Sequence, residues 1–129
     1  MNFIVAGSAV LILGGQQDKP HIWFILTNPD EDDRVLVVML RSRQRHTDNT
    51  TILAPGEYEF GSPVEGAIDY GETMLFPVTK LLGKIQNNRA QMRKPMTPDL
   101  HARVLAGACI SGHTPNWAIS YLQDLGQCP

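Results

Sequence analysis

Two apolar segments on either side of a short acidic turn constrain the fold of this chain more than any other feature. Residues 21–27, HIWFILT, and residues 34–40, RVLVVML, have the length and the aromatic and β-branched content of strands. The six residues between them, NPDEDD, contain Pro29 and a run of acidic side chains, as expected of a solvated turn. This arrangement predicts a β-hairpin, and its second strand, apolar on both faces, is predicted to be central in a sheet.

Shorter strands are predicted around this hairpin. The segment from Asn2 to Leu13 is rich in Val, Ile and Leu and is interrupted at Gly7, as expected of a kinked strand. The other candidate strands are residues 51–53, 57–60 and 72–78, whereas residues 61–71 have the composition of a loop. Short strands at this spacing, with Gly and Pro between them, favour a small barrel or sandwich.

The C-terminal part has helical patterning instead. Residues 78–85, VTKLLGKI, can form one short helix. The pairs Thr97-Pro98 and Thr114-Pro115 each place an N-cap residue before a proline at the first helical position, so they predict two more helices. We therefore predict an α+β, mainly β chain. A barrel domain spans residues 1–86, and a helical extension over residues 87–129 packs on it within one structural domain.

The composition is that of a folded protein with one core. The chain has 129 residues, of which 43% are hydrophobic and 19% charged, and its net charge is −2. Residues 1–78 carry five basic and eleven acidic side chains, a charge of −6, whereas residues 79–129 carry six basic and two acidic ones, a charge of +4. A polyanion would interact more favourably with the second part, and the chain as a whole has no strongly basic field.

Cysteine usage and hydropathy bear on the cellular setting. Cys109 and Cys128 are too few for a disulfide framework or a four-ligand metal site, so we expect reduced thiols in a cytoplasmic protein. The apolar N-terminus lacks a basic region, and its run is shorter than the roughly 20 residues that span a bilayer. We read it as a buried strand and expect no membrane association.

The usual signatures of cofactor chemistry are missing. The sequence has no GxxxxGK[ST], HExxH, CxxC or GxSxG motif. The acidic residues Asp30 to Asp33 lack the alternating ligand spacing of a calcium loop, so a solvated hairpin turn explains them better. We therefore expect neither a metal nor a cofactor.

The segment RSRQRHT that follows the predicted central strand is the main candidate for a binding site. On an extended backbone Arg41, Arg43 and Arg45 would share one face, and the planar guanidinium group suits a phosphate. His21 begins the neighbouring strand, so its imidazole is expected near Arg41 or Ser42. Histidine is suited to general acid–base catalysis and arginine to stabilising a pentavalent phosphorane. The alternative to such a site is that the arginines only solubilise the end of a strand and that His21 is an ordinary surface residue.

Aromatic side chains and one further histidine are candidates for contacts with RNA bases. Trp23, Phe24 and Tyr70 could stack on single-stranded bases, although strand alternation leaves at most one of the first two available. His46 joins Arg43 and Arg45 as a candidate RNA-binding residue. Trp117 and Tyr121, one helical turn apart, are expected to pack on the barrel instead.

The order and spacing of several short motifs along residues 6–86 resemble those of the PemK/MazF family of toxin endoribonucleases. The matching segments are Gly7–Leu11, His21–Thr27, Val38–Ser42, LAPGEYEF at 53–60 and VTKLLGKI at 78–85. The resemblance implies a small SH3-like barrel, commonly a homodimer, that cleaves single-stranded RNA without a metal. In that family the 2′-OH attacks the adjacent phosphate and leaves a cyclic phosphate, and an antitoxin protein fills the groove.

The residues at the family's catalytic positions differ in this chain. His21 replaces the arginine at the start of the second strand, Arg41 replaces the threonine at the end of the third, and Ser42 matches. The exchange is compatible with catalysis by His21 as base and Arg41 as phosphate ligand, with Ser42 beside them. It is equally compatible with a barrel that has lost catalysis and acts as an RNA- or protein-binding module. A third hypothesis is a structural protein that shares the fold alone.

Overall fold

The predicted hairpin forms the centre of the sheet. In the computed structural model, which describes residues 4–13, 19–58 and 64–129, β2 (Pro20–Ile25) pairs antiparallel with β3 (Arg34–Ser42). Residues 35–39 of β3 are buried, because both faces of this strand are covered. The turn between the strands bonds Asp30 to Arg34 through their backbones, so it holds the register of the hairpin.

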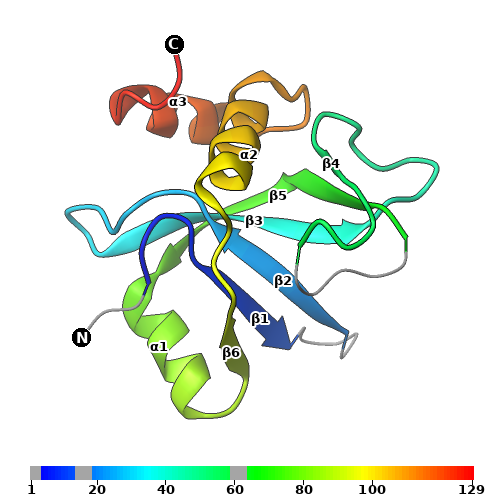
Figure 1. Ribbon diagram of the computed structural model, residues 1–129. Coiled ribbons are helices and arrows are strands. Elements are labelled where there is room, and N and C mark those ends of the chain that lie inside the picture. The colour runs from blue at the N-terminus through cyan, green and yellow to red at the C-terminus, as the bar shows by residue number, and fades with distance from the viewer. Residues whose placement is uncertain (1–3, 14–18, 59–63) are drawn as a thin grey trace.

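Six antiparallel strands make up the sheet, in the order β4-β5-β3-β2-β1-β6. The other four are β1 (Ala9–Leu13), β4 (Ile52–Leu53), β5 (Gly66–Pro77) and β6 (Ala90–Arg93). The sheet curls into a half-barrel (Figure 1). The prediction of an α+β, mainly β fold is confirmed in this form.

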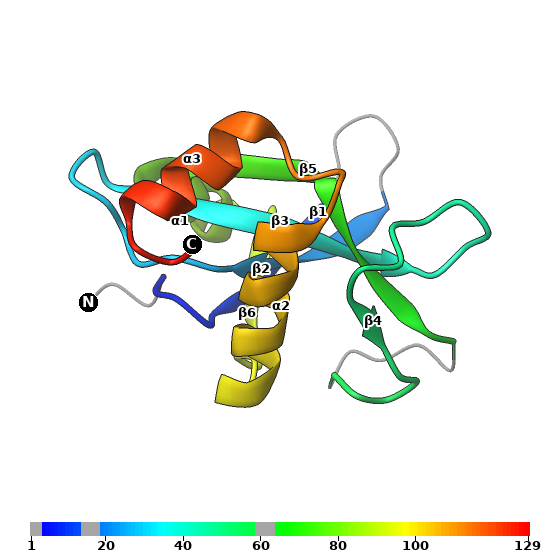
Figure 2. The ribbon, with the colours of Figure 1, turned by 90° about the horizontal axis from the view of Figure 1, so that it is seen from above.

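Helices cover both faces of the sheet. α1 (Val78–Gln86) lies on one face, and α2 (Pro98–Ile110) and α3 (Asn116–Asp124) lie on the other (Figures 1 and 2). Alternate strand residues divide between the two cores, as a period of two requires. Phe24 and Val38 point toward α2 and α3, whereas Ile25 and Val37 point toward α1.

All three predicted helices form, although several of the predicted boundaries differ. α1 forms where expected, and Thr97 caps α2 by accepting a hydrogen bond from the Leu100 N–H at 3.1 Å. Thr114 does not cap α3: the helix begins after Pro115, and the Thr114 hydroxyl is buried without a hydrogen-bond partner. Its side chain packs into the structure and is not turned back toward the first helical turn.

The strand predictions also needed correction. β5 begins at Gly66, inside the segment read as a loop, because Ile68 and Tyr70 supply buried contacts that local composition did not reveal. Residues 57 and 58 form a bend and not a strand, while the remainder of that predicted strand, like Asn2, lies outside the described residues. β6 was not predicted at all, although it pairs with β1 and belongs to the segment assigned to the helical extension.

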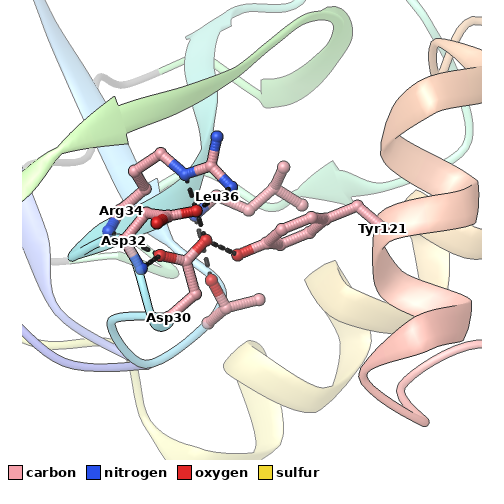
Figure 3. Close-up of polar contacts among 6 residues, drawn as sticks. Asp30, Asp32, Arg34, Leu36 and Tyr121 are labelled. Atoms are coloured by element: carbon pink, nitrogen blue, oxygen red, sulfur yellow. Dashed lines mark hydrogen bonds and ion pairs between the residues drawn. The ribbon is translucent and has the colours of Figure 1, made fainter.

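The acidic hairpin turn is an anchor for α3, not merely a solvated loop (Figure 3). The Asp30 carboxylate accepts hydrogen bonds from the backbone N–H groups of Asp32 and Arg34, both at 2.9 Å, and from the Tyr121 hydroxyl at 2.7 Å. Burial alone would raise the pKa of Asp30, but these hydrogen bonds outweigh it and lower the pKa. The carboxylate thus joins the hairpin to the last helix.

The two cysteines form a disulfide, so the expectation of reduced thiols is wrong. Cys109 near the end of α2 is bonded to Cys128, which is 19 residues further along the chain. Two isolated cysteines gave no sequence signal for this pair, because the two residues come together only where the segment after α3 returns to the end of α2. Among the helices of the described ranges, none is both long and apolar enough to cross a membrane.

Candidate functional site

The main groove lies at the end of the sheet where β3 finishes. Because β2 and β5 both run antiparallel to β3, their first residues lie beside its last residues. The groove has a volume of about 360 Å³. Its walls come from residues 19–22, residues 40–44 except Arg43, residues 53–54, Tyr58 and residues 64–66.

Three predicted catalytic residues line this groove together. The register places Ile22 opposite Leu40, so the next step along the hairpin brings His21 beside Arg41, as the sequence predicted. Ser42 is the last residue of β3 and is exposed. His21, Arg41 and Ser42 all line the main groove. In the sequence they are far apart, because His21 is near the start of β2 and the other two residues are at the end of β3.

The groove combines an apolar floor with a polar rim. Ile22, Leu53 and Tyr58 are nearly fully buried, and Tyr58 contacts Phe24 edge to face with ring centroids 5.1 Å apart. Lys19 adds a second cation to the rim beside Arg41. An apolar surface with a few convergent polar groups is typical of ligand-binding sites. The sequence analysis missed Lys19 and Tyr58, since both reach the groove only through tertiary contacts.

Arg41 is held by a carboxylate from β5. Its Nη1 donates to Asp69 Oδ2 at 2.6 Å, and the two residues are diagonal neighbours because Arg41 pairs with Ala67. The Arg41 side chain is 40% exposed, so the rest of its donor fork can reach a ligand. Asp69 therefore fixes the direction of the guanidinium group, and sequence analysis had not singled it out.

The predicted row of arginines does not form. β3 ends at Ser42, and a turn over residues 44–47 takes the following backbone out of the extended conformation. Arg43 instead pairs with Glu65, with Nη1 and Oε1 at 2.8 Å, and Arg45 is exposed in the turn. Neither of these arginines lines the main groove.

A smaller side pocket adjoins the main groove. It has a volume of about 210 Å³ and shares Arg41 and Gln44 with the main groove. Its other lining residues are His46, Thr47, Asp48, Asp69 and His113. His46 thus lines the side pocket and not the main groove, which His21 lines. His113 was not predicted, because it comes from the connection between α2 and α3.

The aromatic candidates lie elsewhere. Trp23 is partly buried against the core beneath α1 and does not line the main groove or the side pocket. Phe24 and Tyr70 are fully buried, so the idea that Tyr70 stacks on a base is wrong. Within the described parts of the chain, no three His, Cys, Asp or Glu side chains gather as a metal site would require.

No protein-family model, curated protein or solved structure matches this chain. The PemK/MazF resemblance therefore rests on the sequence motifs alone and stays a prediction. The case for a function comes from the groove itself.

Proposed function

We propose that this protein is a metal-independent endoribonuclease that cleaves single-stranded RNA in the main groove. The observation that carries the proposal is the gathering of His21, Arg41 and Ser42 in one groove. These residues supply a proton acceptor, a phosphate ligand and a hydroxyl donor, which RNA transesterification can use to activate the 2′-OH and to stabilise the charge on the phosphate. Lys19 on the rim adds attraction for the RNA backbone.

The proposed reaction uses the 2′-OH of the RNA as the nucleophile. His21 removes the 2′-OH proton while the 2′-oxygen attacks the adjacent phosphorus. Arg41 binds the non-bridging phosphate oxygens with the N–H groups that Asp69 leaves available, and the Ser42 hydroxyl donates to the same phosphate. The bond from phosphorus to the 5′-oxygen breaks, and the 5′-oxygen takes up a proton from an acid or from water. The products are a 2′,3′-cyclic phosphate and a free 5′-hydroxyl.

The resemblance adds the biological setting to this proposal. It assigns the chain to toxins of the PemK/MazF kind, with an SH3-like barrel, a homodimeric state and an antitoxin protein that fills the groove. RNA cleavage and antitoxin binding would both take place in the cytoplasm. The disulfide argues against that location, because disulfides persist mainly in oxidising compartments.

A second candidate is an inactive barrel that binds RNA or protein without turnover. The observation that favours it is the pairing of the arginines with carboxylates, Arg41 with Asp69 and Arg43 with Glu65. Each pair reduces the positive charge that a phosphate would meet. This candidate predicts binding of single-stranded RNA with no cleavage.

The test is incubation of the purified protein with end-labelled single-stranded RNA in EDTA. We expect fragments that end in cyclic phosphate, and a decrease in rate of about 100-fold or more in His21→Ala and Arg41→Ala. Arg89→Ala is the matched control, because Arg89 is exposed beside β6 and outside the groove. Intact RNA after long incubation with excess protein would refute the nuclease, and binding without cleavage would support the second candidate.

A further inference from the structure

The side pocket contains a histidine, His113, whose backbone is held by a hydrogen-bond relay. Ser111, the residue that ends α2, donates its hydroxyl to Asp48 Oδ2 at 2.5 Å and accepts the backbone N–H of His113 at 3.0 Å. Asp48 also accepts two hydrogen bonds from Thr50, one from its N–H at 2.9 Å and one from its hydroxyl at 2.6 Å. The relay ties the connection between α2 and α3 to the loop that follows β3.

A carboxylate accompanies this histidine. Burial would raise the pKa of Asp48, but hydrogen bonds from Ser111 and Thr50 and the charge of His113 outweigh it and lower the pKa. Asp48 is therefore ionised at neutral pH, and it lines the side pocket together with His113. The other charged or titratable groups that line the pocket with His113 are Arg41, His46 and Asp69.

The chemistry of the proposed cleavage requires two proton-transfer groups. In an in-line displacement the attacking 2′-oxygen and the leaving 5′-oxygen lie on opposite sides of the phosphorus. One group must take the proton from the 2′-OH, and another must supply a proton to the 5′-oxygen. Arg41 lines both the main groove, which His21 also lines, and the side pocket, which His113 also lines, so a phosphate bound to Arg41 would border both histidine-containing sites.

We infer that His113 is the general acid that protonates the 5′-oxygen leaving group. This inference rests on the proposed nuclease function. As the bond from the 2′-oxygen to phosphorus forms and the bond from phosphorus to the 5′-oxygen breaks, His21 gains the 2′-OH proton and His113 gives up its own. The C-terminal helices then contribute directly to the active site, and are not merely a cover for one face of the sheet.

His46 lines the same pocket but is the weaker candidate. It lies in the exposed turn after β3, where Thr47 bonds to Gln44, and no relay like that of Ser111 and Asp48 fixes it. A general acid must be held close to the reacting oxygen. The backbone of His113 is tied to Ser111, whereas His46 lies in an exposed turn, so His113 is the better placed of the two.

The test compares ordinary RNA with RNA that has a sulfur in place of the 5′-oxygen at the cleavage site. A thiolate leaves without protonation, so this substrate does not need a general acid. We expect His113→Ala to cleave ordinary RNA about 100-fold or more slowly and to cleave the 5′-thio substrate at close to the wild-type rate. His21→Ala should be slow on both substrates, and Arg89→Ala, which lies outside both the main groove and the side pocket, should be close to wild type on both.

The pH profile supplies an independent measurement. The wild type should show a bell-shaped dependence of kcat/KM, and His113→Ala should lose the decline on the alkaline side, because that decline reports the loss of the general acid's proton. Equal slowing of His113→Ala on both substrates would assign His113 a structural role and overturn the inference while leaving the nuclease intact. A wild-type protein inactive on both substrates would overturn the nuclease itself, and this inference with it.

Discussion

The Tyr70 hydroxyl is buried between the sheet and α2 with two hydrogen-bond partners. It lies 2.7 Å from Thr51 Oγ1 and donates to the Val104 carbonyl oxygen at 2.8 Å. Burial, opposed by the bond with Thr51, raises the pKa of Tyr70 to about 12. This contact needs a close approach of α2, and Gly107 provides the space because it has no side chain at the crossing.

Gly107→Ala should destabilise the fold. A Cβ at this position would lie 2.1 Å from Tyr70 Oη and 2.2 Å from Thr51 Oγ1, so the helix would have to move away from the sheet. We expect the free energy of unfolding to decrease by about 1–3 kcal/mol, as is usual for an overpacked core. Urea unfolding followed by circular dichroism measures the change.

Gly83→Ala is the control for this substitution. Gly83 lies within α1, and a Cβ there would meet no atom within 4 Å. Alanine should therefore stabilise the protein by about 0.5–1 kcal/mol through helix propensity. No loss of stability in Gly107→Ala would contradict the account of α2 packing, and a loss in Gly83→Ala would contradict the open space expected beside α1.

Roles of single residues were the hardest features to predict. Tyr70 resembles a stacking residue in the sequence because its partners, Thr51 and Val104, are 19 and 34 positions away. Thr114 has the composition of a cap, but its position in the core removes it from that role. Local pattern cannot distinguish these cases, since long-range contacts decide them.

At the scale of elements, the polar contact between the hairpin turn and α3 is the most informative. The Tyr121 hydroxyl reaches across 91 residues to the Asp30 carboxylate. Burial and the hydrogen bond to this carboxylate raise the pKa of Tyr121 to about 12.

The elements themselves could largely be predicted from the sequence, since β2, β3, α1 and α2 have strong local patterns. β6 could not, because four residues carry too little pattern to reveal a partner in β1.

Tyr121→Phe should lower the stability of the protein by an amount that depends on pH. At pH 7 we expect the free energy of unfolding to decrease by about 1–2 kcal/mol, because a hydrogen bond to a charged acceptor is lost. The folded-state pKa of Asp30 lies below 3.8, so its contribution is complete above that value and is lost as the pH falls through the lowered pKa. The difference between wild type and Tyr121→Phe should therefore shrink in acid.

On the alkaline side, the stability contribution of this contact changes with pH in the opposite direction. The folded-state pKa of Tyr121 is raised, so the wild type should lose stability as the pH rises from 10 to about 12. Urea unfolding at a series of pH values measures both limbs. Tyr58→Phe is the control, because the Tyr58 hydroxyl donates to the Lys94 carbonyl oxygen, which does not titrate. A difference for Tyr121→Phe that is constant with pH would contradict the pairing with Asp30.

At the scale of the whole molecule, the disulfide closes the C-terminal helices into a loop. It connects Cys109 in α2 with Cys128 beyond α3, so the unfolded chain loses conformational freedom. We expect the double substitution Cys109→Ser, Cys128→Ser to lower the free energy of unfolding by about 2–4 kcal/mol. A reductant should destabilise the wild type by a similar amount and leave the double variant unchanged. Free thiols in the unreduced, folded wild type would contradict this prediction.

The candidate site was partly predictable from the sequence for a reason of topology. The hairpin register follows from two apolar runs and one turn, and it brings His21 to Arg41. The contributions of Asp69 and His113 could not be predicted, because β5 and the connection between α2 and α3 meet Arg41 only after the sheet curls and the helices dock. The complete groove thus depends on the whole fold, whereas His21 and Arg41 both belong to one hairpin.

The number of phosphate contacts at the groove sets how strongly salt should weaken RNA binding. The net charge is −2, so no long-range field attracts the RNA, and binding depends on the few cations at the groove. Lys19 and Arg41 line the groove, whereas Arg43 is paired with Glu65. Two phosphate contacts to a single strand predict a slope of log K against log salt of about −1.4.

Fluorescence anisotropy with 2′-O-methyl RNA measures this slope without cleavage, because the attacking hydroxyl is blocked. Lys19→Ala should reduce the slope by about 0.7, the value for one lost phosphate contact. Lys84→Ala should leave it unchanged, since Lys84 lies in α1 and does not line the groove. A slope close to zero would show that the RNA makes no phosphate contacts in this groove. A slope steeper than about −4 would mean that RNA binds a broader basic surface than Lys19 and Arg41 supply.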